Sequence, residues 1–170
     1  RVLLVDADLR RSTLKSKVAN REAVRLGLSH YLSGLANLDE SLCVTDEPVM
    51  YMLLAGPVPP NPAELLAGRR LDALLDWGRK QFDYILVDTA PLGTLSDAAL
   101  LARKCDGAVV VIEAAKIPYR AVQGVVQQLR DANCPVLGAV LSKVENASSR
   151  NYKYTKYAYQ YTADDKSTKK

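Results

Sequence analysis

The chain has 170 residues, of which 48% are hydrophobic and 25% are charged, and its formal net charge is +4. This balance is typical of one soluble domain and excludes disorder along the whole chain. No run approaches the roughly 18 uninterrupted apolar residues of a membrane-spanning helix, and no signal peptide is recognisable, so we expect an intracellular chain. The three cysteines (Cys43, Cys105 and Cys134) lie far apart, which favours reduced packing residues over a disulfide or zinc framework.

The positive charge lies at the end of the chain. Residues 1–149 contain 17 Lys or Arg and 17 Asp or Glu, whereas residues 150–170 contain six and two. A neutral body argues against a broad interface with duplex nucleic acid, because such binding depends on neutralising phosphates.

Short apolar runs alternate with segments of helical pattern. Four to six consecutive apolar residues predict strands that are covered on both faces, as in a parallel sheet between helices. The runs are residues 2–5, 51–54, 84–87, 108–112 and 136–141. Between them, helices are expected from Asn61-Pro62 to Trp77, after a Ser96 cap, and after Pro118. The order predicts a three-layer α/β fold, with a mostly parallel sheet, helices on both faces and a ligand site at the carboxyl ends of the strands.

The apolar pattern ends after Ser142. We expect a folded domain over residues 1–145 and a flexible, tyrosine-rich tail over residues 146–170. At the other end, Arg1 leads directly into a strand pattern without a methionine, so the chain is expected to be part of a longer protein.

Acidic residues follow two of the predicted strands. Asp6 and Asp8 come after the first run and, being two apart, share a face in extended chain, while Asp88 follows the third run. Magnesium usually takes one or two carboxylates together with phosphate oxygens, so these strand ends predict a nucleotide–Mg²⁺ site with one acid left to act as a base. The alternative is that each Asp only caps the turn that follows its strand.

These motifs resemble a known family. Residues 2–10 (VLLVDADLR) resemble the Walker A′ motif, and residues 85–91 (ILVDTAP) the Walker B motif, of bacterial tyrosine kinases (BY-kinases) of the capsular and exopolysaccharide type. Residues 55–66 (AGPVPPNPAELL) are similar to the segment between those motifs. The resemblance implies a P-loop NTPase-like domain that uses ATP and Mg²⁺. Either Asp motif alone would also suit ATPases of the Par and Min type.

The resemblance also implies roles for individual residues. Asp8 and Asp88 would hold Mg²⁺, directly or through water. Asp6 would take the proton of an acceptor tyrosine, with a pKa kept low by the nearby metal. Arg10 would contact phosphate or a neighbouring acid. Ser142 and Lys143 follow the last run, where related proteins contact the nucleotide base.

The chain departs from the family pattern in two places. It contains no G-x-x-x-x-G-K-[ST] motif, the loop that supplies backbone N–H groups and a lysine to the phosphates. That loop precedes the A′ motif in the family, so its absence fits a chain truncated upstream, and the alternative is a degenerate pseudo-kinase. Ser12 stands where the family often has proline. His30, the only histidine, is expected to have a packing or surface role in a short helix rather than to act in catalysis.

Five tyrosines crowd the tail. Taken alone, the tail could be an inert end, a platform that stacks on single-stranded nucleic acid, or a phosphate acceptor. The resemblance implies an acceptor cluster that neighbouring subunits phosphorylate in trans. The cluster consists of Tyr152, Tyr154, Tyr157, Tyr159 and Tyr161.

The resemblance thus implies a protein-tyrosine autokinase that regulates capsular or exopolysaccharide synthesis and export. The resemblance implies a homo-oligomer at the inner face of the cell membrane, with a transmembrane activator of the polysaccharide chain-length-determinant type and no nucleic-acid partner. Two alternatives stay open: a Par/Min-type ATPase switch, and a non-enzymatic module that binds nucleic acid through the tail.

Overall fold

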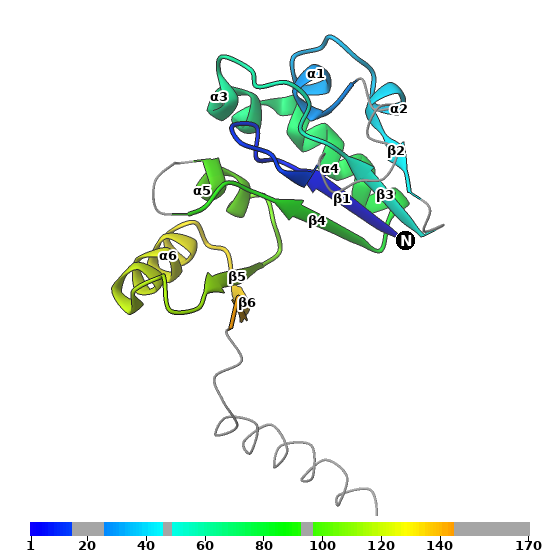
Figure 1. Ribbon diagram of the computed structural model, residues 1–170. Coiled ribbons are helices and arrows are strands. Elements are labelled where there is room, and N and C mark those ends of the chain that lie inside the picture. The colour runs from blue at the N-terminus through cyan, green and yellow to red at the C-terminus, as the bar shows by residue number, and fades with distance from the viewer. Residues whose placement is uncertain (15–25, 46–48, 93–96, 145–170) are drawn as a thin grey trace, which may run out of the picture.

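The computed structural model describes residues 1–14, 26–45, 49–92 and 97–144. Its strands form two sheets, one of four strands in the order β2-β3-β1-β4 and one of two strands, β5-β6 (Figure 1). The strands are β1 (Val2–Asp6), β2 (Cys43–Val44), β3 (Met50–Leu53), β4 (Tyr84–Asp88), β5 (Ala108–Glu113) and β6 (Val136–Ser142). The helices are α1 (Leu28–Leu32), α2 (Leu38–Ser41), α3 (Pro62–Ala67), α4 (Arg69–Gln81), α5 (Asp97–Ala102) and α6 (Tyr119–Asp131).

The strand pairing confirms the predicted parallel α/β class. β1 lies between β3 and β4 and is parallel to both, and β5 is parallel to β6. The two-residue strand β2, which the sequence did not predict, pairs antiparallel with β3. In the part of the chain that the structure describes, β4 and β5 belong to separate sheets, so one edge of each is unpaired.

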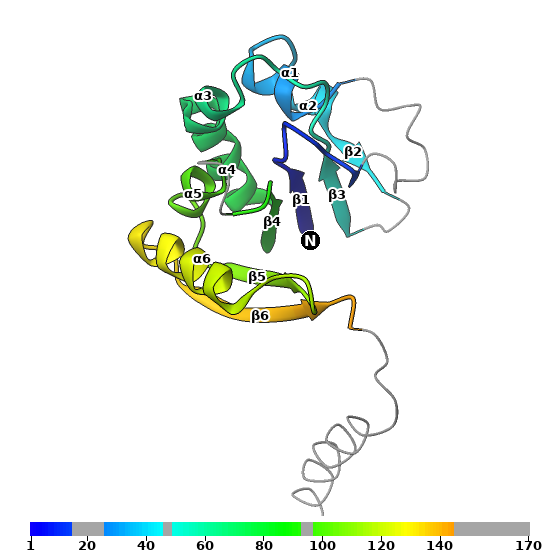
Figure 2. The same ribbon diagram turned by 60° about the vertical axis from the view of Figure 1, so that its left-hand side comes forward.

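The larger core lies between the four-stranded sheet and α4. Leu3 and Val5 of β1 are fully buried there, and Leu71 and Leu74 of α4 pack in the same cluster. Figure 2 shows α3, α4 and α5 on one side of β1 and β4, and α6 along the β5-β6 pair. A smaller core beneath α6 contains Ala102, Leu129, Ala132 and Cys134.

The strands differ in how well their two faces are covered. Leu86 of β4 is 54% exposed and Val111 of β5 is 66% exposed, although both lie in continuous apolar runs. Alternate residues of these strands point away from the described helices, since Ile85 and Val110 pack against the two cores. The expectation of two covered faces therefore holds for β1 better than for β4 and β5.

The helix expected from Pro62 to Trp77 is two helices. Gly68 separates α3 from α4 with an extended backbone, at φ −72° and ψ 156°, and α4 continues to Gln81. Asn61 occupies the predicted N-cap position, but its side chain donates a hydrogen bond to Glu64 Oε2 at 2.8 Å instead of capping the backbone.

The last predicted helix and the cysteines are as the sequence indicated. The helix after Pro118 is α6, and Pro118 is its N-cap. Cys43, Cys105 and Cys134 are all free thiols. In the described ranges, no helix combines the length and apolarity needed to cross a bilayer.

Candidate functional site

Two acidic strand ends meet at one edge of the four-stranded sheet. β1 and β4 are parallel neighbours whose register pairs Asp6 with Asp88. The backbone N–H of Ala7 donates to the Asp88 carbonyl oxygen at 2.8 Å, which carries the pairing one residue beyond the strand. The turn that contains Asp8 follows directly. The first and third apolar runs therefore end in acids at the same edge of the sheet, as the parallel arrangement predicts. We call this edge, with Asp6, Asp8 and Asp88, the acidic rim.

Asp6 is a fully buried carboxylate. Its Oδ2 accepts a hydrogen bond from the Ser12 hydroxyl, while its Oδ1 is buried and has no hydrogen-bond partner of normal geometry among the described residues. Burial raises the pKa of Asp6 above the ordinary 3.8, and the charge of Asp88 adds to this effect. The Ser12 hydroxyl and the backbone amides of Ala55 and Asp8 oppose it. The low pKa that the resemblance implied requires a bound cation, because the protein groups together raise it.

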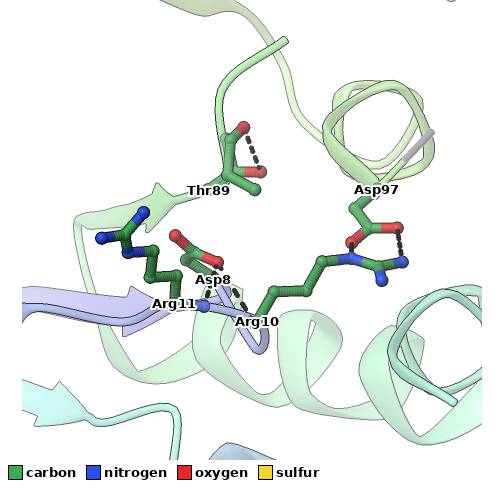
Figure 3. A network of polar contacts seen from close by, with 6 residues as sticks. Asp8, Arg10, Arg11, Thr89 and Asp97 are labelled. Atoms are coloured by element: carbon green, nitrogen blue, oxygen red, sulfur yellow. Dashed lines mark hydrogen bonds and ion pairs between the residues drawn. The ribbon is translucent and has the colours of Figure 1, made fainter. Parts of the chain in front are cut away.

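Asp8 is oriented by its own turn. Its Oδ1 accepts the backbone N–H groups of Arg10 at 3.2 Å and Arg11 at 2.9 Å, a pattern typical of Asp at the start of a turn. Figure 3 shows the Asp8 carboxylate over these two amides, on the side of the loop that faces Thr89. The capping alternative considered for a strand-end Asp thus accounts for one oxygen of Asp8.

The carboxylates fit a metal that is shared with phosphate. In the described ranges, no group of three or more His, Cys, Asp or Glu is arranged to hold a metal ion. Magnesium usually keeps several waters and takes one or two carboxylates plus phosphate oxygens, so the number of carboxylates at this edge is compatible with such a site. The buried Oδ1 of Asp6, beside Asp88, adds negative charge that a cation would neutralise. The individual roles of the three acids stay predictions.

The Arg10 side chain forms an ion pair with a neighbouring acid, Asp97. Its Nε donates to Asp97 Oδ2 at 2.6 Å and its Nη2 donates to Asp97 Oδ1 at 3.1 Å (Figure 3). Asp97 begins α5 and is only 2% exposed. Sequence reasoning missed Asp97, although a single acid at the start of an otherwise apolar helix is a signal that could have identified it.

Ser142 and Lys143, at the end of β6, both contact the neighbouring strand β5. The Ser142 hydroxyl donates to the Ile112 carbonyl oxygen at 3.3 Å, and Lys143 Nζ lies 3.0 Å from Glu113 Oε1. Lys143 and Lys116 lower the pKa of Glu113, with the larger effect from Lys116. The predicted contact of Ser142 and Lys143 with a nucleotide base stays a prediction.

Two further sequence predictions concern the rest of the chain. His30 lies in a short helix, α1, as expected, and its Nδ1 accepts the Gly27 backbone N–H at 3.2 Å. The Ser96 cap and the five tail tyrosines lie outside the described residues.

The chain is similar in sequence to named bacterial tyrosine kinases. It is 37% identical over 145 residues to the tyrosine-protein kinase CpsD of Streptococcus pneumoniae, covering 85% of this chain and 63% of that protein. It is 34% identical over 157 residues to CpsD of Streptococcus agalactiae, covering 92% of this chain and 68% of that protein. The chain thus spans less than two thirds of the first of these relatives. No protein-family model matches it.

The chain is also similar to solved structures of a tyrosine-kinase domain and of an ATPase. The kinase domain of the Escherichia coli tyrosine kinase ETK superposes with a TM-score of 0.79 at 32% identity, covering 88% of this chain and 58% of that one. The Pyrococcus furiosus cell division ATPase MinD superposes with a TM-score of 0.70 at 25% identity, covering 86% of this chain and 61% of that one. These matches confirm the P-loop NTPase-like fold. With 34% identity over 68% of a CpsD, the chain belongs to the bacterial tyrosine-kinase family of the capsular type.

Proposed function

We propose that this chain is the catalytic part of a protein-tyrosine kinase that transfers the γ-phosphoryl group of ATP to tyrosines of its own tail. One observation carries the proposal: the parallel register that pairs Asp6 with Asp88, with Asp8 in the next turn. The tyrosine-kinase relatives and the ETK kinase-domain structure support it.

The transfer is a single displacement at phosphorus. The tyrosine oxygen bonds to the γ-phosphorus, the bond from that phosphorus to the bridging oxygen of ADP breaks, and the hydroxyl proton leaves. Asp6 is the proposed acceptor of this proton, because it ends the strand beside Asp88. Asp8 and Asp88 are the proposed ligands of Mg²⁺, which when bound neutralises charge that develops on the phosphates. The proposed acceptors are Tyr152, Tyr154, Tyr157, Tyr159 and Tyr161.

Residues 1–170 do not themselves supply a phosphate loop. They contain no Gly-Lys pair, so the proposal also requires N–H groups and a lysine for the ATP phosphates that residues 1–170 do not provide, and a chain without them would be a degenerate pseudo-kinase. The activity is therefore to be tested on the complete protein that the gene encodes. Within residues 1–170, Ser142 and Lys143 are the proposed contacts of the nucleotide base.

The proposal extends to partners. We propose that the protein works as a homo-oligomer that phosphorylates tails in trans. A transmembrane activator of the polysaccharide chain-length-determinant type would hold it at the cytoplasmic face of the membrane, where it would regulate capsular or exopolysaccharide export. The capsular kinase relatives support this setting.

The experiment measures phosphotyrosine on the complete protein after incubation with Mg²⁺ and ATP. Asp8→Asn and Asp88→Asn each remove one charge from the rim, and we expect about 10²-fold or greater loss of tail phosphorylation. Asp39→Asn is the control, because Asp39 is an exposed acid of α2. Equal phosphotyrosine in the rim variants and the control contradicts the proposal.

The second candidate is an ATPase switch of the Par/Min type, which the MinD structure favours. It predicts phosphate release from ATP without phosphotyrosine, at a rate unchanged by deletion of residues 150–170. The kinase proposal predicts phosphotyrosine that this deletion abolishes, so one preparation distinguishes the two.

A further inference from the structure

Asp97 is a buried charge with a single dedicated partner among the described hydrogen bonds. Its side chain is only 3% exposed, and both of its carboxylate oxygens accept hydrogen bonds from the Arg10 guanidinium. The two bonds use the planar fork of arginine, the geometry that fixes direction as well as charge. The pair joins residues 87 positions apart in the sequence.

Arg10 belongs to the turn that orients Asp8. Its backbone N–H, with that of Arg11, donates to Asp8 Oδ1. Fixing the Arg10 side chain therefore also fixes a peptide group that holds the Asp8 carboxylate. Figure 3 shows the two halves of this arrangement, with the Asp8 carboxylate over the turn and the Arg10 side chain extending away from it to Asp97.

The turn is thus held at both ends by contacts with other elements. At its start, the Ala7 N–H donates to the Asp88 carbonyl oxygen of β4. At its far end, Arg10 reaches Asp97 on α5, a helix that buries Ala98 and Leu101. Because β4 and α5 are both packed elements, the backbone hydrogen bond to Asp88 and the ion pair with Asp97 together determine where Asp8 lies relative to Asp88.

We infer that Asp97 is a positioning residue, which acts through Arg10 to hold Asp8 in the orientation needed to share a divalent cation with Asp88. Arg10 then serves the turn and not a phosphate group. The inference rests on the proposed function for its biological meaning, but the metal affinity of the rim tests it separately. Partners that orient metal ligands typically change metal affinity or activity by about 10–100-fold when they are removed.

The test uses the complete protein with Mn²⁺ as the probe and a non-hydrolysable ATP analogue. Electron paramagnetic resonance gives the dissociation constant of Mn²⁺, and tail phosphorylation over a range of Mg²⁺ concentrations gives the half-saturating Mg²⁺. Asp97→Asn keeps the shape of the side chain and removes its charge, and we expect both constants to rise about tenfold or more. Arg10→Lys keeps the charge and loses the fork, and we expect a rise in the same range.

The matched control is Asp72→Asn, which breaks the ion pair between Asp72 of α4 and Lys104. It removes an acid whose ion-pair partner, Lys104, follows α5, and no described hydrogen bond joins Asp72 to the Asp8 turn, so both constants should match the wild type. A second comparison adds Asp97→Asn to Asp8→Asn. If Asp97 acts through Asp8, the double variant binds Mn²⁺ no more weakly than Asp8→Asn alone.

The inference is overturned if Asp97→Asn and Arg10→Lys bind Mn²⁺ like Asp72→Asn, or if the effects of Asp97→Asn and Asp8→Asn multiply. If Asp97→Asn does not fold, as judged by circular dichroism and thermal melting, Arg10→Lys alone decides. A wild type that binds Mn²⁺ with the nucleotide but makes no phosphotyrosine refutes the proposed function and leaves the affinity comparison decisive. A wild type that binds no Mn²⁺ with nucleotide overturns both.

Discussion

Asp6→Asn should stabilise the metal-free protein. Asp6 is fully buried, its Oδ1 has no hydrogen-bond partner of normal geometry among the described residues, and it lies beside Asp88. Asparagine keeps an oxygen for the Ser12 hydroxyl and carries no charge, which removes the cost of burying a carboxylate and the repulsion from Asp88. Burying an uncharged amide costs less than burying a carboxylate, so at neutral pH we expect the free energy of unfolding to rise by about 1 kcal/mol or more. That gain corresponds to roughly 2–4 °C in Tm for a chain of this size.

The effect has a defined pH dependence. The folded-state pKa of Asp6 is raised above the ordinary 3.8, so the folded protein binds more protons than the unfolded chain between those two values. The wild type therefore loses stability as the pH rises through that window, and the loss is complete above the folded-state pKa. The advantage of Asp6→Asn should be full at neutral pH and disappear below the ordinary carboxyl value.

The assay is urea unfolding of the complete protein in EDTA, at neutral pH and at successively lower pH values. Asp39→Asn, at an exposed position, should change the free energy of unfolding by less than about 0.5 kcal/mol. A less stable Asp6→Asn, or a gain that stays constant down to the lowest pH, refutes the reasoning. The same variant should lose tail phosphorylation, since it removes the proposed proton acceptor.

Three further predictions concern the scaffold. Leu74→Ala removes a fully buried side chain of the larger core and should lower the free energy of unfolding by about 2–5 kcal/mol in urea titrations. Gly27→Ala should lower the free energy of unfolding by about 1–3 kcal/mol or more, because the new Cβ would lie 2.4 Å from the Leu54 carbonyl oxygen. A Tm equal to that of the wild type would contradict this prediction. Gly124→Ala should raise the stability by about 1 kcal/mol, since this glycine is inside α6 and no atom lies within 4 Å of the added Cβ; calorimetry would detect the shift.

The parts of the fold that follow from local pattern could be predicted from the sequence. The apolar runs that became β1 and β4 are continuous and end in acids, and parallel pairing of such runs brings the acids to one rim. The break at Gly68 was missed because the apolar spacing continues across it, and only the backbone conformation separates α3 from α4. β2 was missed because two residues carry no periodicity.

Asp97 could be noticed in the sequence as the one acid of its helix, but its pairing with Arg10 could not be predicted. The two residues are 87 positions apart, and which acid meets Arg10 depends on how α5 packs after β4. The family resemblance implied that Arg10 would contact phosphate or an acid, and only the three-dimensional arrangement distinguishes these. The Ser12 hydroxyl that donates to Asp6 was likewise visible in the sequence only as a departure from the family pattern.

The unequal sizes of the two hydrophobic cores have a consequence for dynamics. Among the described residues, the core behind β1 contains fifteen buried residues and the one beneath α6 contains four, and the strands of the two sheets share no ladder. Local opening costs less where less apolar surface is buried, so amide protons of β5 and β6 should exchange with solvent sooner than those of β1. The acidic rim then belongs to the slowly exchanging half of the domain, and the strand that ends in Ser142 belongs to the half that opens first.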